Sequence, residues 1–286
     1  MKVFLLTAFA LTAFAFNSIL CRLALRGDEA DAAGFTVVRL ASGAVMLGIL
    51  FLLNRRRKAD TLPTGRVSAF GSWLSAFFLF AYAICFSFAY LGLTTATGAL
   101  VLFGSVQLTM VGVSLAKGVR PRPIEWIGLT VAFGGLVYLV LPGLSAPPLM
   151  NALLMAAAGI AWGFYSLRGK GSEDPLAETS GNFVRSMPMI AAVALVFLSD
   201  LHLSTRGVIL AVLSGAVASG IGYSVWYAAL KHHTPTRAAV LQLSVPVIAA
   251  VGGVVFLAEA ASTRVFVAGT LILGGIGLTM IRRRNT

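Results

Sequence analysis

Long apolar runs limit what this chain can fold into. Ten stretches of mostly apolar residues follow one another with short connections, over residues 3–25, 34–53, 67–91, 95–116, 124–141, 149–167, 180–199, 206–230, 236–257 and 264–281. A run of about 17 to 25 apolar residues spans a bilayer as a helix, which satisfies its own backbone polar groups. The pattern predicts an all-α polytopic membrane protein with ten transmembrane helices.

The composition agrees with a chain that is surrounded by lipid. Hydrophobic residues make up 58% and charged residues 11%, whereas a soluble domain is about a quarter charged. The net charge of +12 could suggest a nucleic-acid partner. However, the basic residues cluster in short connections between apolar runs, and no soluble basic face is interleaved with aromatic residues. We therefore expect a lipid bilayer, and no nucleic acid, as a partner.

The first apolar run resembles a signal peptide because it follows Lys2 directly. It continues to Arg22, which is long enough to span, and Leu20 rather than a small residue precedes Cys21. We therefore interpret it as the first transmembrane helix. Cys21 and Cys85 lack CxxC spacing and fit small buried hydrophobic residues.

The distribution of Lys and Arg predicts the orientation. With the N-terminus in the cytoplasm, the inner connections hold 16 Lys and Arg residues and the outer ones hold 4. Arg39 and Arg185, near predicted helix starts, are counted on neither side. Cytoplasmic loops of membrane proteins carry the excess of positive charge. We expect a multi-pass protein of the cell (inner) membrane with both termini in the cytoplasm.

The two halves of the chain resemble each other. Residues 14–18 (FAFNS) align with residues 162–166 (WGFYS), and Arg39 aligns with Arg185. Each half holds five predicted spans, an odd number, so the second half must enter the membrane upside down. We predict two inverted five-helix repeats, residues 1–143 and 144–286, which together form one membrane domain. Inverted repeats are typical of secondary transporters, whose substrate site lies between the repeats near the bilayer midplane.

The end of the chain resembles a known family. Residues 244–278 (SVPVIAAVGGVVFLAEAASTRVFVAGTLILGGIGL) are similar to the closing segment of the drug/metabolite transporter superfamily, EamA-type branch. The similar features are Pro246 early in a helix, Glu259 at its end and a glycine-rich last helix. The Trp-Gly pair at residues 162–163 also fits. The resemblance implies a transporter built from two such copies.

The first copy departs from the family pattern. Gln107 stands where the family often has proline, and Arg120 replaces the glutamate. Residues 103–112 (FGSVQLTMVG) resemble the YddG-type branch, which implies export of aromatic amino acids and related compounds by alternating access.

Aromatic residues recur at helical spacing in the third span. Phe78, Tyr82, Phe86 and Tyr90 follow at four-residue steps and so share one slowly drifting helix face. Aromatic side chains give large contact area with defined geometry, so we predict an aromatic substrate pocket. The candidate substrate-binding residues are Asn17, Phe78, Tyr82, Phe86, Phe103, Gln107, Trp162, Tyr165, Tyr223, Tyr227 and Gln242. The alternative is the aromatic belt at the membrane surface, which we favour for Trp73, Trp126 and Trp226, with Tyr90 less clear.

Polar side chains inside the spans form a second group of candidates. Asn17, Gln107 and Gln242 are costly if they face lipid, so they either bridge helices or line the cavity. We expect Arg39 and Arg185 to snorkel or to pair with carbonyls. Contact with substrate carboxylates is the alternative for both arginines.

The acidic residues and histidines all fall in connections or at helix ends. Ion-coupled carriers keep such groups in the membrane interior, so we predict a facilitative carrier. No cluster of catalytic or metal-ligating residues and no phosphate loop occurs, so we expect no enzyme, cofactor or metal. The alternatives are a carrier for a sugar, nucleotide sugar or drug-like cation, or a channel. A monomer is the simplest expected state.

Overall fold

The structure is a computed structural model that describes residues 2–59, 70–118, 123–141, 143, 146–169, 172–230, 232–233, 241–242, 244–260 and 262–279. In the first half the helices are α1 (Lys2–Arg26), α2 (Ala32–Ala59), α3 (Trp73–Ala89), α4 (Thr95–Ala116) and α5 (Pro123–Val140). In the second half they are α6 (Leu149–Gly169), α7 (Pro175–Val196), α8 (Thr205–Val212), η1 (Leu213–Ile221), α9 (Gly222–Leu230), α11 (Ser244–Leu257) and α12 (Thr263–Thr279).

The helices follow the apolar runs, which confirms the prediction of an all-helical fold. The π-helix η1 joins α8 and α9 into one continuous segment that matches the eighth predicted span. Within the described residues, six helical segments are long and apolar enough to cross a membrane, and α3, α11 and α12 are shorter apolar helices. The more polar α7 carries Asn182, Arg185 and Ser186 inside its length.

Local caps set several boundaries that hydropathy alone misplaces. The side chain of Ser72 accepts a hydrogen bond from the backbone N–H of Ser75, so α3 starts later than predicted. Asp174 caps α7 in the same way, and Pro175 follows at its first position. This helix therefore begins five residues before the predicted start at 180.

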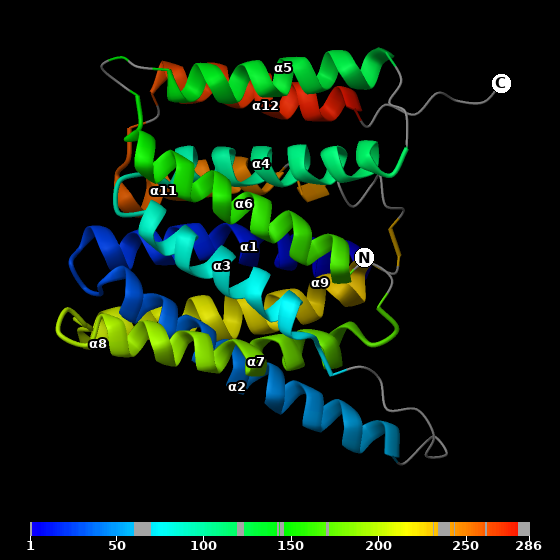
Figure 1. Ribbon diagram of the computed structural model, residues 1–286, viewed down its shortest axis with the longest axis vertical. Helices are drawn as coiled ribbons and strands as arrows, with labels where there is room; N and C mark the ends of the chain where they lie inside the picture. The colour runs from blue at the N-terminus through cyan, green and yellow to red at the C-terminus, as the bar shows by residue number, and fades with distance from the viewer. Residues whose placement is uncertain are drawn as a thin grey trace.

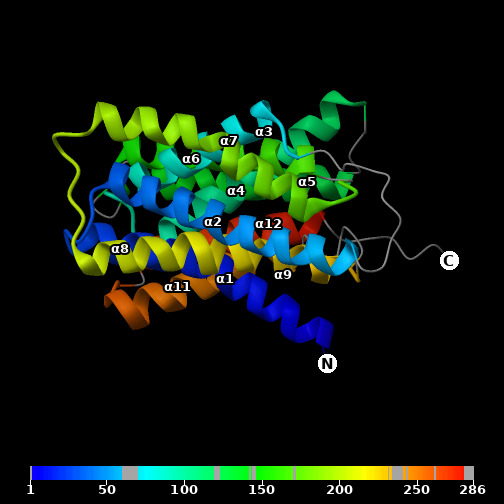
Figure 2. The same ribbon diagram turned by 90° about the horizontal axis from the view of Figure 1, so that it is seen from below.

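Helix α1 lies in the middle of the bundle and contacts α4, α8, η1, α9 and α11 (Figure 1). Around it, α2 packs on α7 and η1, and α3 packs on α6 and α7. Helix α4 packs on α6 and α11. Helices α5 and α12 pair with each other along one edge of the molecule in Figure 1, and Figure 2 shows the bundle turned by 90°.

Helix α6 runs antiparallel to α1. The guanidinium of Arg22, near the end of α1, donates to the carbonyl of Tyr90 just after α3. At the same end, the amide of Asn151, near the start of α6, donates to the carbonyls of Phe88 and Ala89. Helix α6 therefore starts where α1 and α3 end (Figure 1).

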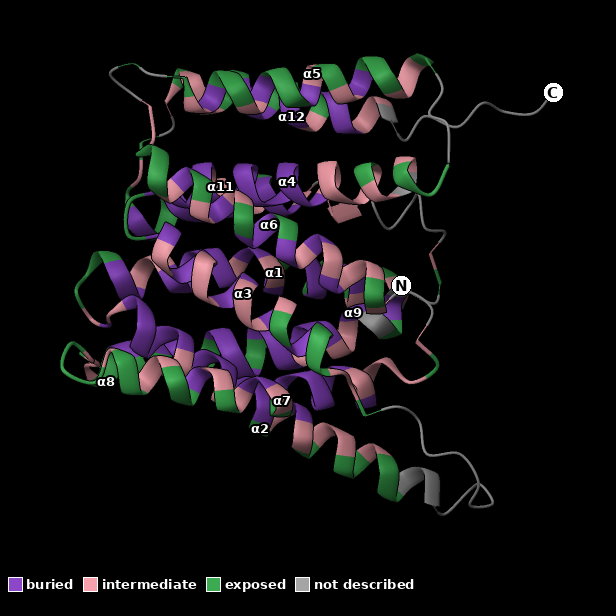
Figure 3. Ribbon diagram, viewed as in Figure 1, coloured by how far each residue is buried: buried purple, intermediate pink, exposed green. Residues whose placement is uncertain are grey.

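Burial divides each helix into an inner and an outer face (Figure 3). Large apolar side chains on the outer faces are exposed, among them Phe266 at 76% and Leu195 at 72%. Apolar surface of this extent is unusual for a soluble monomer and is expected for helices that face lipid.

Helices α2 and η1 approach unusually closely. A Cβ atom on Gly215 of η1 would lie 2.0 Å from the carbonyl oxygen of Arg39 in α2. Only glycine fits this contact, because a methyl group there would overlap the opposite backbone. The close approach fixes the position of α2, and therefore of Arg39, against the second half of the chain.

Candidate functional site

A small pocket lies between the two halves of the chain, with a cavity volume of about 20 Å³, which in this state is room for about one water molecule. Helices α1, α3, α4, α6 and α9 contribute to its wall, together with one residue before α11. The lining residues are Phe14, Asn17, Ser18, Tyr82, Phe86, Leu102, Phe103, Trp162, Tyr223 and Gln242. The wall is mostly aromatic, and several polar groups interrupt it.

The pocket brings together most of the residues that the sequence indicates. These are Asn17, Tyr82, Phe86, Phe103, Trp162, Tyr223 and Gln242. Three residues that the sequence did not indicate also line the pocket: Phe14, Ser18 and Leu102. The repeat contained a signal for the first of these, because Phe14 aligns with Trp162.

The aromatic wall is continuous from one half of the chain to the other. The ring of Trp162 lies 4.8 Å from that of Tyr82 and 5.3 Å from that of Tyr223, measured between centroids. The ring of Phe14 meets Tyr223 edge-on at 5.6 Å. Rings in these arrangements attract one another and hold a defined surface. Such a surface suits a flat or apolar solute.

Two other candidate residues form contacts beside the pocket. Phe78 stacks on Phe164, with centroids 5.3 Å apart and an angle of 19° between the rings. Each four-residue step along a helix turns the side chain by about 40°, so Phe78 points about 80° away from Phe86. Tyr165 packs on Trp162 at 5.3 Å and lines a second, smaller pocket with a cavity volume of about 10 Å³.

The remaining two candidates are Gln107 and Tyr227. Gln107 is half-buried in α4 and is absent from both pocket linings. Tyr227 belongs to α9, but its side chain lies outside the described residues.

Of the four residues predicted for the aromatic belt, two have exposed side chains and two are buried. Trp73 is 60% exposed and Trp126 is 51% exposed, as expected for side chains at the membrane surface. Tyr90 is fully buried against Phe86, and Trp226 is buried against Phe14. Assignment of Trp226 to the belt was wrong, because a position near a helix end does not reveal which face of the helix packs inward.

The amide of Asn17 is fixed by the π-helix. Its side-chain oxygen accepts hydrogen bonds from the hydroxyls of Ser214 at 2.8 Å and Ser219 at 3.3 Å. Residues five apart lie about 140° apart around an α-helix. The wider turn of η1, bonded from residue i to i+5, brings both serines to one side. Asn17 therefore both bridges helices and lines the pocket.

Arg39 differs from the prediction that it snorkels or pairs with carbonyls. Its side chain is buried, and Nη2 donates to the hydroxyl of Tyr82 at 2.9 Å. The guanidinium also lies 4.8 Å from the ring centroid of Phe86 and 5.3 Å from that of Tyr82. Arg185 behaves as predicted, because it donates to the backbone carbonyls of Phe70 and Gly181.

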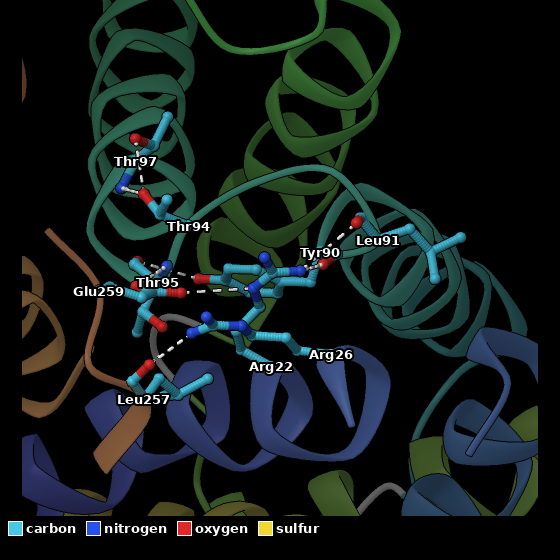
Figure 4. A network of polar contacts seen from close by, with 9 residues as sticks. All are labelled: Arg22, Arg26, Tyr90, Leu91, Thr94, Thr95, Thr97, Leu257 and Glu259. Carbon is cyan, nitrogen blue, oxygen red and sulfur yellow. Dashed lines mark hydrogen bonds and ion pairs between the residues drawn. The ribbon is translucent and has the colours of Figure 1, made fainter. Parts of the chain in front are cut away.

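A polar network closes the bundle at the end where α1 and α3 finish (Figure 4). Arg22 pairs with Glu259 at 3.3 Å and donates to the carbonyl of Tyr90 at 2.7 Å. The other carboxylate oxygen of Glu259 accepts from the backbone N–H of Thr95 at 2.8 Å. Arg26 donates to the carbonyl of Leu257. Together these bonds join α1 to the start of α4 and the end of α11.

The other acidic groups of the described chain lie in connections or in the first turns of helices. Glu29 pairs with Arg206 at 3.4 Å at the end of the molecule that holds the Arg22 network. The described residues contain no group of three or more His, Cys, Asp or Glu that could hold a metal ion. Asp60 and Arg120 lie outside the described residues.

Three comparisons place the chain among known proteins. A solved crystal structure matches with a TM-score of 0.67 and 20% identity over 98% of each chain, which shows a shared fold. An uncharacterised protein of Pseudomonas aeruginosa is 46% identical over 99% of this chain and 96% of its own length. An uncharacterised transporter of Archaeoglobus fulgidus is 24% identical over 99% of both chains.

A sequence model of the EamA-like transporter family matches residues 149–281, which run from α6 to just beyond α12. The uncharacterised transporter of Archaeoglobus fulgidus matches almost the whole chain, and the apolar helices give it the architecture of a multi-pass membrane protein. The second half of the chain therefore carries a domain of the EamA-like transporter family.

Proposed function

We propose that this transporter is a facilitative carrier, which exports aromatic or hydrophobic amino acids by alternating access. The observation that supports it most is the aromatic pocket between the two halves, where Tyr82, Trp162 and Tyr223 form one continuous surface. Rings of this kind offer contact area to a flat side chain, while Asn17 and Gln242 offer polar contacts.

The helix contacts support two inverted repeats, residues 1–143 and 144–286. In this relation α1 to α5 correspond, in order, to α6, α7, the α8–α9 segment, α11 and α12. Each main contact between two helices then has a counterpart between the two corresponding helices. The pair α3–α6 matches α1–α9, α4–α6 matches α1–α11, and α2–η1 matches α3–α7. The pairs α2–α7, α4–α11 and α5–α12 match themselves. The opposite directions of α1 and α6 fit the same relation.

The match to the family sequence model supports the same division. It covers a block of five predicted spans that lies within the second repeat. Two related halves that meet at a pocket can exchange conformations, so that one arrangement opens outward and the other inward.

The excess of Lys and Arg supports an orientation with both termini in the cytoplasm of a cell with an inner membrane. Helix α12 ends at the end of the molecule where α1 begins (Figure 1). In this orientation, the network of Arg22 and Glu259 faces outward. Both walls of the pocket come from one chain, which supports a working monomer.

Thermal unfolding of the purified protein with L-tryptophan, L-phenylalanine, sugars and cationic drugs tests the proposed substrate class. We expect the aromatic amino acids to raise the melting temperature. The substitution Trp162→Ala removes a ring from the pocket wall and should raise the half-maximal ligand concentration about tenfold or more.

Trp126→Ala is the matched control, because that tryptophan is 51% exposed and lies on α5, away from the pocket. It should leave the ligand response unchanged. Equal ligand responses in the wild type and the Trp162→Ala protein would contradict the proposed site. Stabilisation by sugars or cations alone would contradict the proposed substrate class.

A further inference from the structure

Arg39 carries a buried positive charge in α2. Its side chain is 2% exposed inside α2. One terminal nitrogen, Nη2, donates to the hydroxyl of Tyr82. The other, Nη1, is buried and has no hydrogen-bond partner among the described residues. A guanidinium has five N–H donors in a fixed plane, so a substantial part of its bonding capacity is unused.

Within the described residues, no carboxylate balances this charge. The ion pairs there join Arg22 to Glu259 and Arg206 to Glu29, both at one end of the bundle. The groups around Arg39 are the rings of Tyr82 and Phe86, which contact the cation through their faces. Burying a charge without a counterion is costly, most of all inside a membrane. An anionic ligand would reduce that cost.

The charge lies directly behind the wall of the pocket. Tyr82 and Phe86 both line the pocket, and both contact the guanidinium of Arg39. The positive charge is therefore separated from the pocket by a single layer of rings. In a low-dielectric interior its field is little screened at that distance. A carboxylate in the pocket is attracted by this field, and an ammonium group is repelled.

The hydroxyl group of Tyr82 links the charge of Arg39 to a ligand in the pocket. Its hydroxyl oxygen accepts the hydrogen bond of Arg39, so the hydroxyl proton remains available for another acceptor. A phenol that accepts from a cation is polarised and becomes a stronger donor. The Tyr82 side chain lines the pocket, so a carboxylate there can accept from it.

We propose that Arg39, acting through Tyr82, makes the pocket selective for solutes that carry a carboxylate beside an apolar or aromatic body. Cationic solutes of the same shape are disfavoured. This proposal rests on the proposed carrier function, and it names the charge that the substrate must carry. Arg39 is a specificity-determining residue that acts through Tyr82, which lies between it and the pocket.

Four ligands of matched shape test the proposal by thermal unfolding of the full-length protein in detergent. Indole-3-propionate and tryptamine share a ring but differ in charge, and hexanoate and hexylamine are the aliphatic pair. We expect indole-3-propionate to stabilise the wild type at concentrations about tenfold lower than tryptamine. The substitution Arg39→Met, similar in length but uncharged, should abolish this preference.

Arg185→Met is the matched control, because Arg185 aligns with Arg39 in the repeat but bonds to the carbonyls of Phe70 and Gly181. It should keep the preference for the carboxylate. A second variant, Tyr82→Phe, keeps the ring and removes only the hydroxyl. It should weaken binding of indole-3-propionate and leave tryptamine unchanged, which gives a test even if Arg39→Met does not fold.

The outcomes separate this proposal from the carrier function on which it rests. Equal stabilisation of the wild type by the two indoles would overturn the role of Arg39 and leave the aromatic carrier standing. Stabilisation by hexanoate but by neither indole, lost in Arg39→Met, would support the role of Arg39 and refute the aromatic substrate class. No stabilisation by any of the four ligands, while L-tryptophan still raises the melting temperature, would overturn the role of Arg39 and leave the carrier function standing.

Discussion

At the scale of single residues, the pocket depends on contacts between distant parts of the sequence. Trp162 of α6 lies between Tyr82 of α3 and Tyr223 of α9. Asn17 of α1 is held by two serines of η1. None of these side chains could form the pocket wall alone. A substitution of any one of them therefore tests how the helices pack around the pocket.

The fit of Gly215 against α2 gives a prediction about stability. In Gly215→Ala the new methyl group would lie 2.0 Å from the carbonyl oxygen of Arg39, so the helices must separate. We expect a loss of about 1–3 kcal/mol, measured as a lower melting temperature, together with weaker ligand binding. Gly274→Ala is the control, because no atom lies within 4 Å of the added Cβ. Equal melting temperatures for the two variants would contradict the close contact.

Much of the lining of the candidate pocket could be predicted from residue type and spacing. Tyr82 and Phe86 share a helix face because they are four residues apart, and both line the pocket. Phe78 continues the same spacing but rotates away and stacks on Phe164. The partner of Arg39 could not be predicted, because its bond to Tyr82 depends on how α2 and α3 pack. Hydropathy carries no information about such long-range contacts.

At the scale of elements, the network at the end of α1 joins the two halves. Arg22 and Glu259 connect α1 to the segment after α11, and Thr95 adds the start of α4. Several helices begin or end at this end of the bundle. These bonds would therefore have to break before the bundle could open there. The network therefore has the position of a gate under alternating access.

Weakening this gate should make the pocket more accessible from the end of the molecule that holds the Arg22 network. Glu259→Gln removes the charge but keeps an oxygen that can accept from Thr95. In a protein without Cys21 and Cys85, a cysteine introduced at the pocket residue Ser18 should react severalfold faster with a membrane-impermeant maleimide applied from outside. Unchanged labelling would contradict the assignment of the network as a gate.

Glu29→Gln is the control for this experiment. It removes the other ion pair at the same end, between Glu29 and Arg206, which joins the connection after α1 to α8. The Arg22 network does not include this pair, so labelling at position 18 should stay at the wild-type rate.

The helical elements themselves are well predicted, and the π-helix is not. Apolar length predicts each helix, while caps such as Ser72 and Asp174 set the boundaries. In the printed sequence, residues 213–221 resemble any apolar segment with small residues. Their π-helical form places Ser214 and Ser219 together on Asn17. That pairing depends on the tertiary contact with α1.

At the scale of the whole molecule, the two halves of the chain meet at the aromatic pocket. The counterpart contacts of α1–α5 and α6–α12 support an inverted repeat, which the odd number of predicted spans in each half requires. The described acidic groups lie in connections or in the first turns of helices. This placement supports a carrier that moves its substrate down the substrate's own gradient.

Counterflow in liposomes tests this account most directly. Liposomes that contain the protein and unlabelled L-tryptophan, without a pH or sodium gradient, are diluted into labelled L-tryptophan. We expect a transient accumulation of label above the outside concentration, which saturates with substrate and is strongly reduced in Trp162→Ala but not in Trp126→Ala. An absolute requirement for a pH gradient, a flux that does not saturate, or unchanged flux in Trp162→Ala would contradict a facilitative carrier with this aromatic pocket.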